Sequence, residues 1–112
     1  MGNGVDIIIP VYNAYDELQM CLESLFMYTN LVDNRLILVN DNSSDLRIKS
    51  LLEHCKKENP NKNIVLFHNE KNMGFSNNVN LGMAQSENND ILLLNSDTRV
   101  TKNWIEKIKA CA

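Results

Sequence analysis

Residues 35–52 read RLILVNDNSSDLRIKSLL, and this stretch decides the fold. Residues 35–39 are almost entirely aliphatic, which is typical of a buried strand. The polar turn NDNSSD follows, and either Ser44 or Asp45 can cap the helix that comes next. The predicted buried side of that helix holds Leu46, Ile48, Leu51, Leu52 and Cys55. The stretch therefore predicts a strand, a polar turn and an amphipathic helix in succession.

The same unit recurs along the chain. Further aliphatic runs stand at residues 5–11 (VDIIIPV), 64–67 (IVLF) and 91–94 (ILLL). Helical spacing of apolar residues follows at 13–30 and at about 76–85. A last helix is predicted after Thr101 as its cap, with Trp104, Ile105 and Ile108 facing inward. We therefore expect four strand–helix units.

Strands that are apolar throughout are those that helices cover on both faces, which predicts a parallel α/β sheet. In such sheets ligands bind outside the carboxyl ends of the strands. The residues at those ends are polar here, at 10–13, 40–45, 68–74 and 95–98. We expect these four loops to meet at one edge of the sheet.

Composition limits the class of protein. A chain of 112 residues, 44% hydrophobic and 22% charged, suits one compact domain. Its net charge of -3 and lack of a basic cluster argue against nucleic-acid binding. No run reaches the roughly 18 to 20 apolar residues of a membrane span, and the start lacks signal-peptide features. Cys21, Cys55 and Cys111 form no C-x-x-C pair, so we expect reduced, structural thiols and a cytoplasmic location.

Two carboxylates stand out at the predicted edge, because neither G-x-G-x-x-G nor a P-loop motif is present. Ionised Asp41 can only accept hydrogen bonds, so it could receive the N3–H of uracil or thymine but not pair with cytosine N3. Asp97 is a hard oxygen ligand of the kind that Mg²⁺ and Mn²⁺ prefer.

Four segments in order, VDIIIPVYN, LILVNDNSSD, NEKNMGFSNNVNLGMAQ and DILLLNSDTRV, resemble the nucleotide-binding half of family 2 glycosyltransferases. The N-x-D-T form, in place of D-x-D, is similar to rhamnosyltransferase-like members. The resemblance implies a Rossmann-like GT-A fold, with a parallel sheet of about four strands in the order 3-2-1-4 and helices on both faces.

The resemblance also implies the roles of single residues. Asp41 would read the base, and Asp97 would bind Mg²⁺ or Mn²⁺. Tyr12 could stack on the base. The other nucleotide-binding residues implied are Pro10, Val11, Asn13, Lys71, Asn72, Gly74, Asn80, Asn95 and Ser96. Asn95 leaves one fewer charge for the cation than an acidic residue would.

The implied reaction is transfer of a sugar from a UDP- or dTDP-sugar to a hydroxyl of an acceptor glycan or lipid-linked saccharide, with inversion. The setting would be bacterial cell-surface polysaccharide synthesis, in the cytoplasm or at the inner face of the membrane. A general base is expected beyond Ala112, since Glu106 lies on a predicted exposed helix face. We therefore expect residues 1–112 to be the donor-binding segment of a longer enzyme, inactive alone. Further sequence or an oligomer would cover the apolar edge strand at 91–94.

Other interpretations stay open. The domain could be a non-catalytic module that binds nucleotide sugars, or a flavodoxin-like phosphate binder. Asp97 could simply form an Asx-turn, and Tyr12 could be a packing residue. Met73 and Phe75 are expected to anchor their loop. His54 and His68 lack metal-binding partners at suitable spacing, so both are expected to be structural.

Overall fold

The computed structural model describes residues 4–86 and 89–111. Strands and helices alternate along them, as the sequence predicts. The elements are β1 (Val5–Val11), α1 (Tyr15–Tyr28), β2 (Arg35–Asn40), α2 (Leu46–Glu58), β3 (Ile64–His68), α3 (Phe75–Met83), β4 (Asp90–Leu93) and α4 (Trp104–Cys111).

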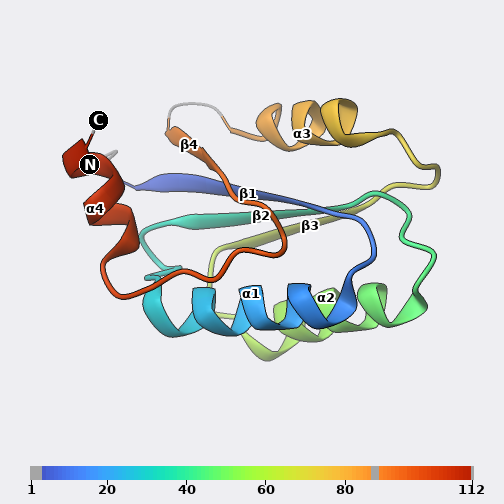
Figure 1. Ribbon diagram of the computed structural model, residues 1–112, viewed down its shortest axis with the longest axis horizontal. Coiled ribbons are helices and arrows are strands. Elements are labelled where there is room, and N and C mark those ends of the chain that lie inside the picture. The colour runs from blue at the N-terminus through green and yellow to red at the C-terminus, as the bar shows by residue number, and fades with distance from the viewer. Residues whose placement is uncertain (1–3, 87–88, 112) are drawn as a thin grey trace.

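The four strands form one parallel sheet in the order β3-β2-β1-β4, which confirms the predicted topology (Figure 1). β1 pairs with β2 along its length, up to Val11 opposite Asn40. β4 pairs only as far as Leu93, which lies opposite Ile8. β4 therefore ends three residues before β1 does, so the loop after β4 starts farther back than the other loops.

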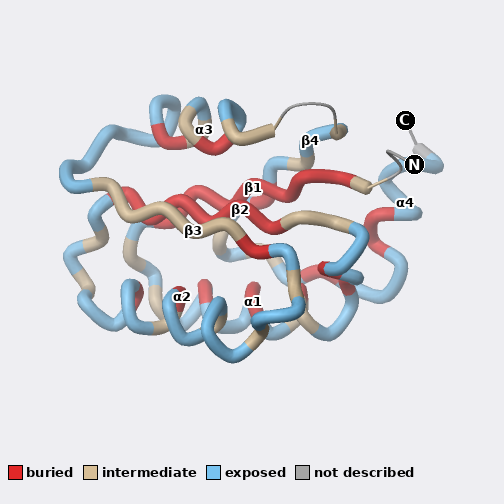
Figure 2. Tube along the Cα trace, turned by 180° about the vertical axis from the view of Figure 1, so that it is seen from behind, coloured by how far each residue is buried: buried red, intermediate tan, exposed pale blue. Residues whose placement is uncertain are grey.

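Helices cover both faces of the sheet. α1 and α2 pack below it and α3 above it in Figure 1, while α4 lies near the amino end of β1. Side chains alternate between the two faces of β1: Ile7 and Ile9 join the larger core under the sheet, and Ile8 joins Ile37 and Val39 under α3. β1 and β2 are buried along nearly their whole length, as Figure 2 shows. The largely aliphatic sequences of both strands agree with this two-sided burial.

A buried ion pair closes the amino end of the sheet. Asp6 on β1 is fully buried and accepts hydrogen bonds from Arg35 at 3.2 and 3.3 Å and from Asn89 at 3.1 Å. Burial acts to raise the pKa of Asp6, but hydrogen bonds from Ser86, Asn89 and Arg35, with the charge of Arg35, outweigh it and lower the pKa. Arg35 also donates to the carbonyl of Gln85. The pair thus ties the connection between α3 and β4 to the sheet.

Three details of the helices differ from the prediction. Leu46, the first residue of α2, is 80% exposed, whereas Ile48 and Leu52 on the same helix are buried. Ile108 is 45% exposed, whereas Trp104 and Ile105 are buried. α4 begins at Trp104, whose amide donates to the carbonyl of Thr101, so Thr101 lies too early to be the helix cap.

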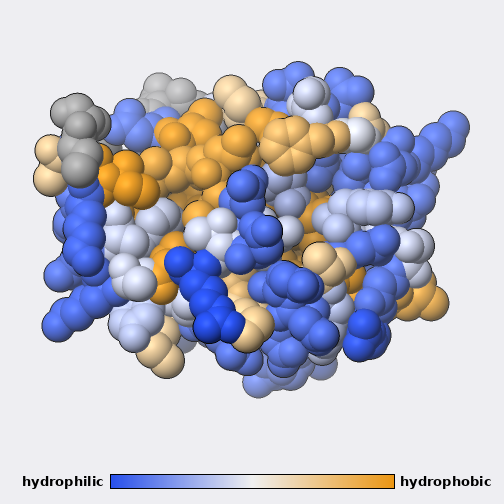
Figure 3. Space-filling view, in the orientation of Figure 1, coloured by the Kyte–Doolittle hydropathy of each residue, from blue (hydrophilic) through white to orange (hydrophobic). Residues whose placement is uncertain are grey.

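β4 is an edge strand, as predicted. Its apolar side chains are more exposed than those of β1 and β2. Ile91 and Leu93 are 37% and 49% exposed, and Met83 at the end of α3 is 43% exposed. Figure 3 shows hydrophobic surface over β4 and toward α3. An exposed apolar edge of this kind can pair with further chain.

No helix within residues 4–86 and 89–111 has the length and apolar character needed to cross a membrane. Cys21 and Cys55 are free thiols, as expected, and burial raises the pKa of both. The side chain of Cys111 lies outside the described part of the chain.

Candidate functional site

The loops after β1, β2 and β3 meet at the carboxyl edge of the sheet, at the right of Figure 1. The segment after β4 lies nearer the middle of the sheet, since β4 ends opposite Ile8. We predicted that four loops would meet at this edge. The loops after β1, β2 and β3 do so, and the segment after β4 starts farther back along the sheet. The β4 loop approaches from the side on which α1 packs.

Asp41, directly after β2, organises the loop that follows β3. It is 3% exposed. Its Oδ1 accepts hydrogen bonds from the Met73 amide at 2.7 Å and from Asn69 Nδ2 at 3.0 Å. Its Oδ2 accepts one from the Gly74 amide at 3.0 Å. The carboxylate therefore holds the turn into α3 against the end of β2.

This network leaves Asp41 one acceptor position. A carboxylate offers about four lone-pair sites on its two oxygens. Two donors occupy Oδ1 and one donor occupies Oδ2 among the described residues. By this count, one lone pair of Oδ2 is used by no donor among the described residues.

A pocket of about 210 Å³ opens beside this carboxylate. It is lined by Pro10, Val11, Tyr12, Asp41, Asn72, Gly74, Phe75 and Asn78. Its volume lies below the roughly 300 to 1,000 Å³ of pockets that enclose a whole drug-sized ligand, so it suits a small group or part of a larger ligand. Six of these eight residues are among those that the resemblance implies.

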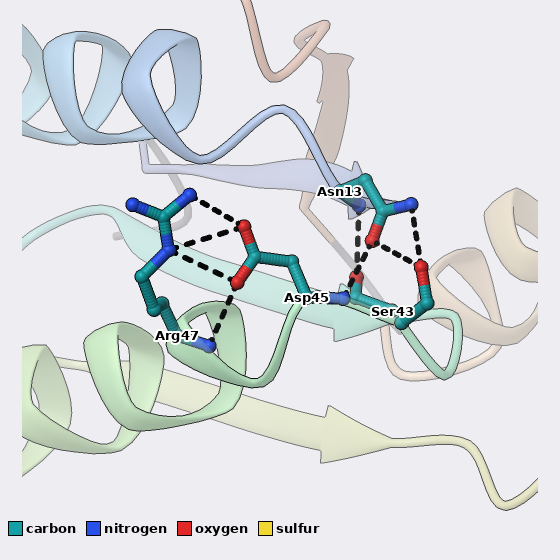
Figure 4. Close-up of polar contacts among 5 residues, drawn as sticks. Asn13, Ser43, Asp45 and Arg47 are labelled. Carbon is teal, nitrogen blue, oxygen red and sulfur yellow. Dashed lines mark hydrogen bonds and ion pairs between the residues drawn. The ribbon is translucent and has the colours of Figure 1, made fainter.

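Asn13 joins the β1 loop to the β2 loop (Figure 4). Its amide donates to Ser43 Oγ at 2.9 Å, and its side-chain oxygen accepts from the Asp45 amide at 3.0 Å. Asn13 and Ala14 have φ values of 54° and 56°, which turn the chain sharply between Tyr12 and α1. Asn13 therefore has a structural role here, and its contacts set the position of Tyr12 at the pocket.

Asp45 is the N-cap of α2, which resolves the choice between Ser44 and Asp45. Its Oδ1 accepts from the Arg47 amide at 3.0 Å. The Arg47 guanidinium returns to the same carboxylate at 2.7 Å, as Figure 4 shows, and lowers the pKa of Asp45. The guanidinium also lies 4.2 Å from the ring centre of Tyr15 on α1. These contacts fix the start of α2 against α1.

His68 at the end of β3 is structural, as expected. Asn40 Oδ1 accepts from the amide and the hydroxyl of Ser43, at 3.1 and 2.7 Å. The Asn40 amide nitrogen therefore faces His68 Nδ1, at 3.0 Å, and that ring nitrogen is the acceptor. His68 thereby holds Asn40 in the orientation that supports the β2 loop.

The segment carrying Asp97 rests on α1. The Cys21 thiol lies 3.9 Å from the carbonyl of Asn95, and Ser24 Oγ accepts from the Val100 amide at 3.0 Å. Burial and then the charge of Asp97 raise the pKa of Cys21 to about 11. Asp97 is exposed, and the described residues give its carboxylate no hydrogen bond or ion pair. Its carboxylate thus remains available to an external cation.

Asp97 fits a cation that a ligand helps to hold. Within the described residues, no three His, Cys, Asp or Glu side chains gather closely enough to bind a metal alone. Mg²⁺ in particular is commonly held by one or two carboxylates together with substrate phosphates and water. A single exposed carboxylate agrees with that mode and not with a preformed protein cage.

The structure brings some of the predicted site residues together and separates others. Those that share the pocket are Pro10, Val11, Tyr12, Asp41, Asn72 and Gly74. Those outside its lining are Asn13, Lys71, Asn80, Asn95, Ser96 and Asp97. Lys71 and Asn80 are exposed, and their nucleotide-binding roles stay predictions.

Three residues of this region were missed from the sequence. Phe75 was expected to anchor its loop but is 61% exposed and lines the pocket. Asn69 bridges Asp41 and Asn78, at 3.0 and 2.7 Å, and Asn78 is 2% exposed. The available signal was an aromatic residue placed directly after the loop glycine, within a stretch unusually rich in Asn.

Comparison with known proteins agrees with this geometry. The family model described as Glycosyl transferase family 2 matches residues 6–110. The chain belongs to this family. The rhamnosyltransferase-like form of the N-x-D motif stays a prediction.

Two bacterial relatives illustrate the family 2 match. An uncharacterized glycosyltransferase of Haemophilus influenzae is 31% identical over 106 residues, covering 93% of this chain and 31% of the relative. The teichoic acid poly(glycerol phosphate) polymerase of Staphylococcus epidermidis is 32% identical over 95 residues, covering 85% of this chain and 13% of the relative. The chain thus spans less than a third of either relative.

Solved structures confirm the GT-A fold of this family 2 domain. S. aureus TarS 1-349 in complex with UDP-GlcNAc aligns with a TM-score of 0.79 at 22% identity, over 96% of this chain and 30% of that chain. The mannosyltransferase PcManGT from Pyrobaculum calidifontis, in complex with GDP-Man and Mn²⁺, aligns with a TM-score of 0.79 at 15% identity, over 88% and 29%. At these identities the likeness concerns the fold.

Proposed function

We propose that this domain binds the donor of a glycosyltransferase reaction, a UDP- or dTDP-sugar, whose sugar passes to an acceptor hydroxyl. The observation that carries the proposal is the pocket at Asp41, where Oδ2 retains one acceptor position. The N3–H of uracil or thymine is a donor that matches it, whereas N3 of cytosine is an acceptor. Solved relatives of the same fold hold UDP-GlcNAc or GDP-Man, which supports a nucleotide sugar.

Asp97 is proposed to hold Mg²⁺ or Mn²⁺ beside the donor diphosphate. The bound cation would supply positive charge against the negative charge that gathers on the leaving diphosphate. Asp97 is exposed and held by the backbone contacts of its segment to α1, so it can meet such a cation without rearranging the core. Mn²⁺ in the PcManGT structure supports a divalent cofactor.

The acceptor and the general base are proposed to lie in further sequence of a longer enzyme. The chain spans about a third of its relatives or less. Glu106, the acid that follows Asp97 within the chain, is exposed on α4 and lies outside the pocket lining. The similarity to a teichoic acid polymerase supports cell-surface polysaccharide synthesis, and inversion follows from the family resemblance.

Calorimetric titration of the chain with UDP, dTDP and CDP, with and without Mn²⁺, tests the donor role. We expect UDP and dTDP to bind more tightly than CDP, and Mn²⁺ to strengthen binding. Asp97→Ala should remove the Mn²⁺-dependent gain, whereas Asp90→Ala, which changes an exposed carboxylate on β4, should not. Absence of UDP and dTDP binding, or an unchanged gain in Asp97→Ala, would contradict the proposal.

The second candidate is a non-catalytic module that binds nucleotide sugars. The site geometry favours it equally, since Asp41 is the one carboxylate among the described residues that line the pocket. Hydrolysis or transfer assays on the longer protein separate the two candidates. Sugar transfer that depends on Asp97 would establish the enzyme, and binding without transfer would establish the module.

A further inference from the structure

We propose that Phe75 and Tyr12 enclose the base of the bound nucleotide between two aromatic rings, which makes Phe75 a determinant of donor affinity. This inference rests on the proposed function. Asp41 would contact the edge of the base and Tyr12 one face of it. The inference adds a contact of Phe75, on α3, with the other face.

Exposure of the two rings is the first observation. Phe75 is 61% exposed and Tyr12 is 50% exposed, and both line the pocket beside Asp41. The large apolar side chains of β1, which ends directly before Tyr12, are buried, whereas these two rings line a pocket and face solvent. A planar ring that enters between exposed aromatic faces buries apolar surface and stacks on them, and both effects favour binding.

The second observation is that both rings are attached to rigid backbone. Phe75 is the first residue of α3 and follows Gly74, whose φ of 85° few other residues adopt. The Gly74 amide is bonded to Asp41, and buried Asn78 donates to the carbonyl of Val39 at 3.0 Å. The start of α3 is therefore fixed relative to the sheet.

The backbone at Tyr12, on the β1 loop, is also held in place. Val11 before it is paired with β2, and Asn13 after it is bonded to Ser43. The two rings thus come from backbone segments that hydrogen bonds hold in place. Fixed backbone at both residues reduces the conformational entropy that is lost when a ring binds between them.

The rings and the carboxylate would divide the recognition of the base. Stacking is tolerant of base identity because every base has a π-face. The single open acceptor position on Asp41 Oδ2 is selective, since it requires a donor on the base edge. Phe75 therefore contributes affinity, and Asp41 contributes the choice of base.

Titration of Phe75 variants with UDP and dTDP in the presence of Mn²⁺ tests the inference. Phe75→Ala should weaken both ligands by roughly 5- to 150-fold, the range that stacking on one aromatic ring supplies. Phe75→Tyr should retain affinity within about 2-fold, whereas Phe75→Leu, which keeps apolar bulk without a ring, should behave like Phe75→Ala. Met83→Ala changes an exposed residue at the other end of α3 and should bind as the wild type does.

The outcomes separate this inference from the function on which it rests. If the wild type binds neither UDP nor dTDP, the proposed function fails. If the wild type binds but Phe75→Ala binds equally well, or if Phe75→Leu restores full affinity, the proposed function stands and the role of the Phe75 ring is wrong. Thermal unfolding of each variant checks that a loss of affinity does not reflect a loss of folding.

Discussion

The carboxylate of Asp41 lies 3.0 Å from the backbone amide of Gly74, and this hydrogen bond joins the end of β2 to the start of α3. The same carboxylate accepts the Met73 amide at 2.7 Å. Asp41 therefore holds the loop that forms part of the pocket, in addition to any contact with a ligand. Loss of this residue should affect stability as well as binding.

Asp41→Asn should lower the free energy of unfolding by about 1 to 3 kcal/mol. The amide nitrogen that replaces one carboxylate oxygen is a donor, so it would face the donor N–H of Gly74 and leave that N–H only its bond to Asn72 Oδ1. Urea unfolding followed by the fluorescence of Trp104 measures the change. Asp90→Asn on exposed β4 is the control and should stay within about 0.5 kcal/mol of the wild type. Equal stability of both variants would contradict the structural role of Asp41.

Asp6→Asn should destabilise the fold by about 2 kcal/mol near neutral pH, because it removes the charged partner of Arg35. The pKa of Asp6 is lowered in the folded chain, so its stabilising effect is present above the ordinary value of 3.8. That effect is lost as the pH falls below 3.8 through the folded pKa. The unfolding free energies of wild type and Asp6→Asn should therefore converge in acid.

Glu23→Gln on the exposed side of α1 is the control for this pH series. It should follow the wild type at every pH. A difference between wild type and Asp6→Asn that stays constant from neutral pH down to below the ordinary pKa would argue against the charged pair with Arg35.

Ser24→Ala should weaken the Mn²⁺-dependent part of UDP binding by about 5-fold, the equivalent of about 1 kcal/mol. Ser24 Oγ accepts the Val100 amide and donates to the carbonyl of Cys21, so its loss releases the segment that carries Asp97. Calorimetry with and without Mn²⁺ separates this effect from binding of the base. Ser50→Ala on exposed α2 should change neither quantity. An unchanged Mn²⁺ gain in Ser24→Ala would show that the segment does not depend on this contact.

Gly82→Ala should destabilise the fold by about 1 to 3 kcal/mol. A Cβ at this position would lie 2.7 Å from Cγ2 of Ile8, so α3 could not stay as close to the sheet. The gain in helix propensity, about 1 kcal/mol at most, does not offset that clash. Thermal unfolding measures the effect, with exposed Met83→Ala as the control on the same helix. A raised melting temperature would mean that α3 packs less closely than described.

Hydrophobic pattern predicted the sheet well where burial is uniform. β1 and β2 are aliphatic and buried on both faces, so pattern and structure agree. The pattern failed at two positions: Leu46 and Ile108 have helical spacing but are 80% and 45% exposed. The spacing of apolar residues predicts which face of a helix a residue occupies. It does not predict whether another element packs against that residue.

Side-chain roles at the site were less predictable than the motifs. Asp41 was assigned to the base from its position after β2, and its bonds to the amides of Met73 and Gly74 were not foreseen. Phe75 was taken as a loop anchor, yet the turn at Gly74 directs it to the pocket. A hydrogen bond between residues about 30 positions apart leaves no local signal in the chain.

The sequence by itself determined the order of strands and helices, the parallel sheet and the family, because these depend on periodicity and on motifs that are local. Tertiary structure alone decided that Asp41 is buried with three donors on its carboxylate, and that Tyr12 and Phe75 line the same pocket. These properties depend on distances between loops that only the packing of α1, α2 and α3 on the sheet sets.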